Sequence, residues 1–217
     1  MGLAILPPDI NQSNSAWTGK EGAIRVGLMA VGGLSERCRS AIVAERQAAP
    51  FQNMADLLQR IRLSDAEARA LIHCGALDTF CGPGQRAALL WELALWQKSR
   101  EAASNAQGLF DSEPGPLPPP KIPGTNEHER LRREFAVLGF LCDRHPMTLF
   151  SRALQRFRRV KAVALADFIG KRIRFAGWLI TGKRVQTKHG EAMEFLTIED
   201  ETGCVEATFF PETYRRF

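Results

Sequence analysis

Two adjacent glycines and a serine form a stretch of this sequence that is suited to holding an anion. Gly32 and Gly33 can take backbone conformations that bring the chain close to another molecule. Ser35 opens a helical pattern and can cap its first N–H groups. Such a helix start has bare donors and partial positive charge, so Gly32, Gly33, Leu34, Ser35 and Arg37 are candidate contacts to a phosphate.

The order of an apolar residue, a glycine-containing turn, an apolar residue and a helix resembles a helix-hairpin-helix, which grips nucleic-acid backbone without reading bases. The usual hairpin has glycine, an apolar residue and glycine, whereas Gly33, Leu34 and Ser35 stand here. The other interpretation is a plain glycine turn between packed helices.

A second candidate site combines basic and aromatic residues towards the C-terminus. Lys183, Arg184 and Lys188 lie on a predicted basic loop, 181–190, between strands that carry Trp178 and Phe195. Cationic side chains follow phosphates while aromatic rings stack on bases, a combination typical of single-strand binding.

A third candidate lies in the proline-rich stretch 105–126, which favours an extended conformation. It contains Gln107, Leu109 and Phe110, and an apolar pair in such a setting can dock in a groove of a partner. Alternatively, Leu109 and Phe110 pack back onto the preceding helix.

Enzymatic and metal chemistry find little support. The five cysteines are scattered and never form a C-x-x-C pair, which indicates reduced thiols. His73, Cys74 and Cys81 lie close in sequence, but a zinc site needs a fourth ligand, so we predict no metal site. No nucleophile and base stand in a recognisable arrangement, so no catalytic residue is predicted.

Charge is divided unevenly along the 217 residues. Residues 1–129 hold 12 Lys and Arg against 14 Asp and Glu, whereas residues 130–217 hold 17 against 10. The basic second half favours a polyanionic partner.

No apolar run approaches the roughly 20 residues that span a bilayer, and the N-terminus has no basic segment typical of a signal peptide. We expect a cytoplasmic protein with no membrane partner.

The pattern of apolar residues predicts an α+β, multidomain chain. Helical periodicity predicts helices over 35–48, 51–61, 64–72, 85–103, 127–141 and 147–157. Ser64 and Glu67 form a capping box at the start of the third of these. Alternation indicates strands at 173–180, 193–199 and 205–210. The last three suggest a curved meander of the OB type, which needs five strands. The expected segments are short strands in 1–26, a helical hairpin domain in 27–80, a helix in 81–104, the linker 105–126, a helical connector in 127–170 and a partial OB-type barrel in 171–217.

Taken together, the pieces resemble the C-terminal part of the bacterial DNA polymerase III alpha subunit, in its replicative or error-prone form. They follow that family's order and are these: Leu6 to Asn11, Ile24 to Ile42, Ala70 to Asp78, Val137 to Phe140 with His145 and Pro146, Thr187 to Gly190, and Leu196 to Gly203.

The resemblance implies DNA binding in replication or error-prone synthesis. A tandem helix-hairpin-helix domain would hold duplex backbone, and the OB domain would contact single-stranded template, neither being specific for sequence. The family's linker often carries a sliding-clamp pentapeptide, so Gln107, Leu109 and Phe110 are the clamp-binding candidate and other replisome subunits are possible partners.

The resemblance also sets limits on catalysis. The family's catalytic aspartates, which hold Mg²⁺, lie in a palm domain that this sequence does not match. We therefore expect no cofactor in this chain and no polymerisation by the chain alone, although its parent would be a DNA-directed DNA polymerase. Both ends fall inside domains of the family, so we expect a fragment.

Overall fold

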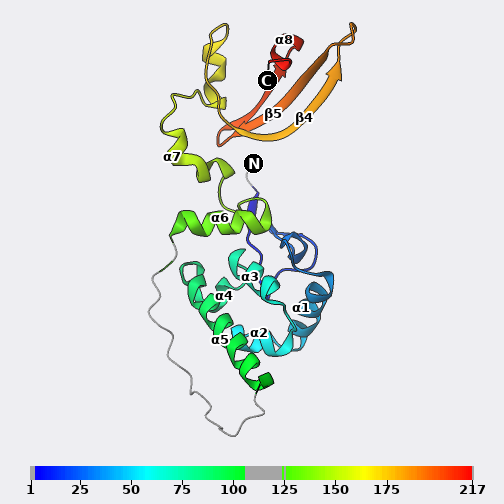
Figure 1. Cartoon of the computed structure of the whole chain (residues 1–217), viewed down its shortest axis with the longest axis vertical. Coiled ribbons are helices and arrows are strands. Elements are labelled where there is room, and N and C mark those ends of the chain that lie inside the picture. Colours follow the sequence, from blue (N-terminus) through cyan, green and yellow to red (C-terminus); the bar gives the residue numbers. More distant parts are fainter. Residues whose placement is uncertain (1–2, 106–123, 125, 217) are drawn as a thin grey trace. The chain divides into compact units, whose positions relative to one another are not determined.

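The structure, a computed structural model, describes residues 3–105, 124 and 126–216 (Figure 1). The chain forms two compact units, residues 1–143 and residues 144–217, and each is described by itself.

The first unit begins with a small sheet, and the segment after its first strand contacts the helices. Strand β1 (Ala4–Leu6) runs parallel to β3 (Ala23–Arg25), and β2 (Thr18–Lys20) pairs antiparallel on the other side of β3. The buried Ile10 donates its N–H to the carbonyl of Ala76 at 2.8 Å. The side chain of Asn11 both donates to and accepts from the backbone of Phe51. The segment that follows β1 is thus tied to the helical core.

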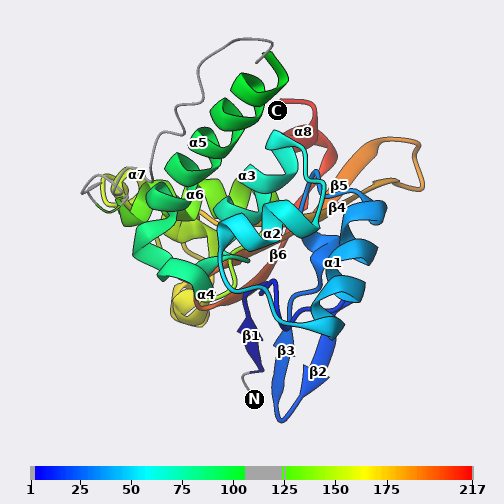
Figure 2. The same cartoon turned by 90° about the horizontal axis from the view of Figure 1, so that it is seen from below.

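Figure 2 shows the helices of this unit from below. Their buried side chains form one apolar core. The helices are η1 (Leu28–Ala30), α1 (Glu36–Ala48), α2 (Met54–Arg60), α3 (Asp65–His73), α4 (Asp78–Cys81), η2 (Pro83–Gln85), α5 (Arg86–Asn105) and α6 (Glu127–Leu138). The largest fully buried side chains include those of Leu28, Ile42, Phe51, Leu57 and Leu71. Burying side chains of this size contributes about 1.5–3 kcal/mol each.

Polar caps and glycines set where these helices start and stop. Ser35, Asn53 and Ser64 accept hydrogen bonds from the first turns of α1, α2 and α3. Helix α6 ends earlier than the predicted Leu141, because Gly139 takes a left-handed conformation with φ at +80°.

A buried ion-pair network joins three helices of the unit. The Arg86 guanidinium binds both oxygens of Asp78 at 2.7 and 2.6 Å and lies 3.4 Å from Glu134. Gly75 beside it has φ at +86°, a conformation that favours glycine, and an added Cβ would meet the Arg86 side chain. The network joins α5 and α6 to α4.

The second unit consists of short helical turns and one sheet. These elements are η3 (Pro146–Phe150), α7 (Ser151–Leu154), η4 (Ala162–Phe168), β4 (Trp178–Gln186), β5 (Ala192–Asp200), β6 (Gly203–Phe209) and α8 (Pro211–Tyr214). The strands are antiparallel in the order β4-β5-β6. The Asp200 side chain closes the last turn by accepting from the N–H groups of Thr202 and Gly203.

Three details of this unit differ from the sequence-based expectation. The first strand begins at Trp178 instead of Ile173, because Val160 donates to the carbonyl of Arg174 and holds that segment outside the sheet. The strand continues to Gln186, so Lys183 and Arg184 lie within β4 and not in a loop. The predicted helix 147–157 is a 3₁₀ turn followed by four α-helical residues.

Candidate nucleic-acid interface

Two helix starts lie side by side in the first unit. The glycine turn (residues 31–35) opens α1, and a second turn (residues 61–64) opens α3. The buried Cys38 of α1 contacts the backbone of the second turn, with its Sγ 3.7 Å from the carbonyl oxygen of Arg62. The two turns therefore face solvent from adjacent positions.

The first glycine has a packing role. The Gly32 N–H donates to the Val137 carbonyl in α6 at 3.0 Å, and a Cβ at this position would lie 2.7 Å from the same oxygen. Gly33 has φ at +83°, in the region that favours glycine. Leu34 is buried and belongs to the core. The turn thus has its shape fixed from within the protein.

One carboxylate caps both helix starts. Glu67 accepts from the N–H and Oγ of Ser35 at 3.2 and 2.6 Å, and from the N–H and Oγ of Ser64 at 2.9 and 2.8 Å. Burial alone would raise the pKa of Glu67, but the hydrogen bonds from Ser35 and Ser64 lower it to about 2. An internal anion thus occupies the position where the sequence suggested that Ser35 meets a phosphate.

The remaining donors of the two turns are exposed. Within the described part of the chain, the N–H groups of Gly33 and Arg37 have no hydrogen-bond partner, and the side chains of Arg37 and Arg62 have no ion pair. Arg37 and Gly33 were predicted from the sequence, whereas Arg62 was not. These three residues can meet a phosphate without displacing Glu67.

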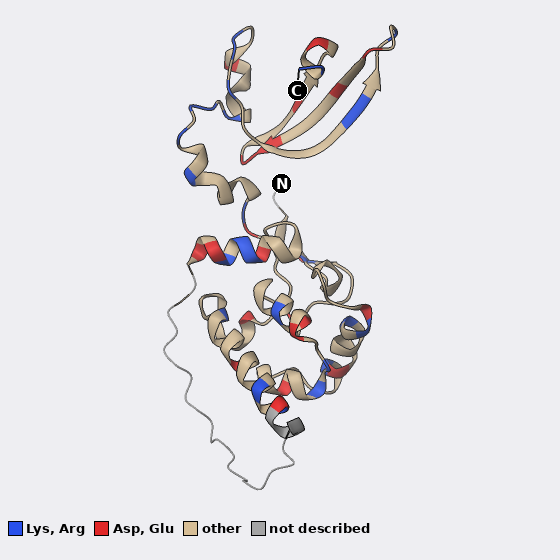
Figure 3. Cartoon of the chain, viewed as in Figure 1, with Lys and Arg blue, Asp and Glu red and all other residues tan. Residues whose placement is uncertain are grey.

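The candidates of the second unit are spread along the sheet. Lys183 on β4 is the cross-strand partner of Phe195 on β5, and Arg184 lies over the ring of Tyr214 at 5.2 Å. Lys188 lies in the turn after β4. Figure 3 shows the basic stretch of β4. Phe195 is 45% exposed, so its ring is accessible for stacking.

Trp178 does not join that group. It begins β4, five residues before Lys183, a separation of roughly 17 Å along a strand. Its ring packs against Phe150 with centroids 6.2 Å apart. Trp178 therefore has a packing partner, and its role in DNA binding stays a prediction.

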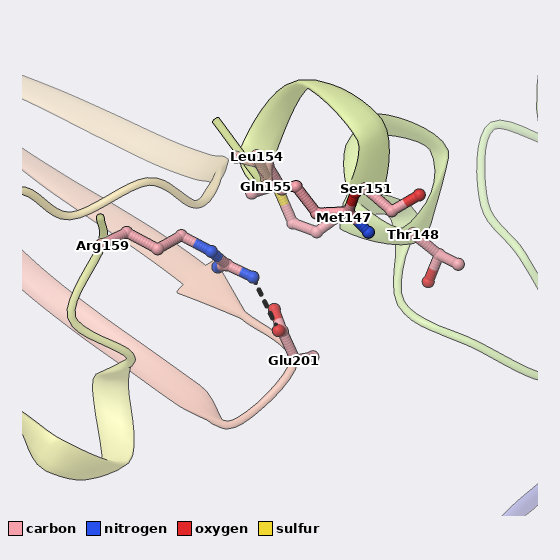
Figure 4. A pocket seen from close by; sticks show the side chains of 7 residues that line it. All are labelled: Met147, Thr148, Ser151, Leu154, Gln155, Arg159 and Glu201. Atoms are coloured by element: carbon pink, nitrogen blue, oxygen red, sulfur yellow. Dashed lines mark hydrogen bonds and ion pairs between the residues drawn. The ribbon is translucent and has the colours of Figure 1, made fainter. Parts of the chain in front are cut away.

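A hollow in the second unit shows no chemistry of its own. It holds about 360 Å³ and is lined by Met147, Thr148, Ser151, Leu154, Gln155, Arg159 and Glu201 (Figure 4). The Arg159 guanidinium binds Glu201 at 2.7 Å, so the two charges that line the hollow are paired with each other. Ser151 has no histidine beside it among the residues lining this hollow.

Three of the thiols are not suited to act as nucleophiles. Burial raises the pKa of Cys74 and Cys142 to about 12 and that of Cys81 to about 11, which keeps all three protonated. Over residues 3–105, 124 and 126–216, no three His, Cys, Asp or Glu side chains gather as a metal site would require. In the same ranges, no helix is long and apolar enough to cross a membrane.

The clamp-binding candidate residues Gln107, Leu109 and Phe110 lie outside the described residues. The second unit also contains a cluster of basic side chains to which the sequence analysis assigned no role. Its members include Arg158, Arg172 and Arg174. Its signal was present in the sequence, because residues 152–174 hold eight Lys and Arg against one acidic residue.

Comparisons with known proteins agree with this geometry. A family model described as a helix-hairpin-helix motif matches residues 2–89. The DNA polymerase III subunit alpha of Halalkalibacterium halodurans is 28% identical across this whole chain, and that of Bacillus subtilis is 31% identical across 99% of it. The error-prone DNA polymerase of Corynebacterium efficiens is 33% identical across 99%. The chain spans about a fifth of the length of these curated relatives, 20%, 20% and 19% respectively.

Proposed function

We propose that this chain is a DNA-binding, non-catalytic portion of a DNA polymerase III alpha subunit or error-prone DNA polymerase. Its similarity, over its whole length, to the C-terminal regions of such polymerases supports the proposal. The observation that carries the proposal is the pair of adjacent helix starts with exposed Gly33, Arg37 and Arg62. It lies inside the region that matches the helix-hairpin-helix model.

Duplex backbone is the ligand proposed for the first unit. Two turns side by side present cationic side chains and backbone N–H groups at a solvent-facing edge, and such contacts position DNA without reading its sequence. Glu67 would keep the turns in register and direct phosphates towards Gly33 and the two arginines. The expected binding is weakened by salt.

Single-stranded DNA is the ligand proposed for the second unit. The sheet β4-β5-β6 supports the proposal that this unit is part of an OB-type domain, a fold that binds single strands. Lys183, Arg184 and Lys188 would contact phosphates, and Phe195 would stack on a base. Nucleotide transfer, with its Mg²⁺, is assigned to other parts of the relatives' length.

A titration of labelled duplex DNA tests the first part of this proposal. We expect R37A/R62A to weaken binding by about tenfold at low salt and to lower the slope of log affinity against log salt by about 2. The control is K98A/R100A, which removes the same charge from exposed positions on α5. Equal affinities of the two double variants would refute the assignment of the two turns.

A sliding clamp is the protein partner proposed for the linker, because Gln107, Leu109 and Phe110 match the order of an anchor followed by an apolar pair. Replacing Leu109 and Phe110 by alanine should abolish co-elution with a bacterial sliding clamp. Co-elution that persists in this variant would exclude the docking role.

The free thiols of all five cysteines support a reducing compartment, and we propose the cytoplasm.

A further inference from the structure

A basic hollow in the second unit lies apart from the predicted sheet residues. It is lined by Arg158, Arg159, Val160, Phe168, Arg172, Ile173 and Arg174, and it holds about 720 Å³. Pockets that bind small molecules and cofactors have volumes of about 300–1,000 Å³. No acidic side chain lines it. The hollow is therefore large enough for a small ligand, and the charged side chains that line it are all positive.

Three of its four arginines are available to a ligand. Arg159 is committed to Glu201 and to the carbonyl of Ala176. Arg158, Arg172 and Arg174 are exposed, and none has an ion pair within the described ranges. Guanidinium groups without carboxylate partners favour a phosphate, to which each presents a planar fork of donors.

One backbone hydrogen bond brings the two segments that carry these arginines together. Val160 donates its N–H to the carbonyl of Arg174 at 2.9 Å, which joins the segment carrying Arg158 to the segment carrying Arg172 and Arg174. Residues distant in sequence are thereby placed around one hollow. The arrangement is built by the fold and is not a simple run of basic residues.

Aromatic and apolar surface adjoins the charge. Phe168 lines the hollow, is 36% exposed and lies 5.5 Å from the Lys171 ammonium. A second, mainly apolar hollow shares Arg159, Ile173 and Arg174 with the first and adds Phe157, which is 56% exposed. Phosphates and unstacked bases are thus offered neighbouring surfaces, as in proteins that bind single strands.

We propose that this hollow binds a segment of single-stranded nucleic acid, with phosphates on Arg158, Arg172 and Arg174 and bases against Phe157 and Phe168. The proposal rests on the proposed function in taking DNA as the polyanion, and it adds a second single-strand site to the one on β4 and β5. An acidic peptide would use the arginines but would not need the exposed rings.

The role of the three arginines is tested by the fluorescence anisotropy of a labelled oligothymidylate that is titrated with the full chain. We expect R158A/R172A/R174A to weaken binding at least tenfold at low salt and to lower the salt slope by about 2, since each phosphate contact on a single strand contributes about 0.7. R158K/R172K/R174K should keep the slope. The control K98A/R100A/R132A removes equal charge from exposed positions, and a loss no greater than that of the control would overturn the proposal.

The rings are tested by F157A/F168A in the same titration. We expect about a 5- to 100-fold loss of affinity, typical of lost stacking, with an unchanged salt slope. Unaltered affinity, together with displacement of the strand by polyglutamate, would overturn the proposal in favour of an acidic peptide. Circular dichroism spectra and thermal unfolding show whether each variant is folded.

The variant K183A/R184A/K188A distinguishes the proposed site on the sheet from the proposed site in the hollow. If this variant binds the oligothymidylate normally while R158A/R172A/R174A does not, the hollow is the single-strand site and the sheet assignment fails. If only the sheet variant loses affinity, the proposal for the hollow is wrong and the sheet assignment stands.

Discussion

Ser35 and Glu67 lie 32 positions apart in sequence, and the Ser35 hydroxyl donates to the Glu67 carboxylate at 2.6 Å. The same carboxylate closes the capping box of α3 with Ser64. One side chain therefore stabilises both helix starts, and the turns that we propose for DNA contact keep their spacing through it.

Replacing Glu67 by glutamine should destabilise the first unit. The groups facing the carboxylate from Ser35 and Ser64 are all donors, and an amide NH₂ cannot accept from them. We expect a loss of about 1–3 kcal/mol in the free energy of unfolding at pH 7, measured with urea. E36Q, at an exposed position in the first turn of α1, is the control and should change little.

Lowering the pH should remove the stabilisation by the Glu67 carboxylate in the unchanged protein. The pKa of Glu67 is lowered from 4.5 to about 2 in the folded state. Because the folded value lies below the unfolded one, the stabilisation is complete above pH 4.5 and is lost as pH falls towards 2. Urea midpoints between pH 6 and 2.5 should therefore fall less steeply in E67Q than in the unchanged chain, and parallel curves would contradict this role.

Alanine at Gly32 should disturb the packing of the glycine turn on α6. Its Cβ would lie 2.7 Å from the Val137 carbonyl oxygen, so the turn must shift and its hydrogen bond must lengthen. We expect a loss of about 1–3 kcal/mol in thermal unfolding. At Gly84 an added Cβ meets nothing within 4 Å, so G84A serves as the control, and equal effects at the two sites would argue against a tight contact.

Replacing Arg86 should strongly lower the free energy of unfolding of the first unit. Glu134 is 4% exposed and its pKa is already raised by burial, against the pull of Arg86 and Arg130. R86L would leave this carboxyl and Asp78 with fewer partners, and breaking such a buried pair costs about 3–5 kcal/mol. R69A breaks a half-exposed pair with Asp65 and should cost less than about 1 kcal/mol. Similar urea midpoints for the two variants would show that the buried network adds no stability.

Local signals in the sequence predicted more of the fold than long-range ones. The spacing of Ser64 and Glu67 identified the capping box, and Ser35 was recognised as a helix cap, because both depend on residues within one turn. The second use of Glu67 depends on the packing of α1 against α3, which no local pattern contains. The α+β fold class and the resemblance to polymerase III alpha subunits were confirmed.

Strand boundaries were harder for a physical reason. Alternation in 173–180 has the period of a strand, but the Val160–Arg174 hydrogen bond holds its first half outside the sheet. Strand β2 has only three residues, too few for a pattern to be visible. The arginines of the basic hollow could be counted in the sequence, yet their convergence depends on that same hydrogen bond.

The contacts between α6 and the earlier helices have a consequence for how the chain responds to cutting. Gly32 binds Val137, and Arg86 binds Glu134, so α6 is attached by its own side chains and backbone as well as by covalent connection. A protease that cleaves between Asn105 and Asn126 should yield two pieces that elute together from a sizing column. R86L, which weakens the attachment, should let them separate. The first unit would then behave as a split protein that reassembles from its halves.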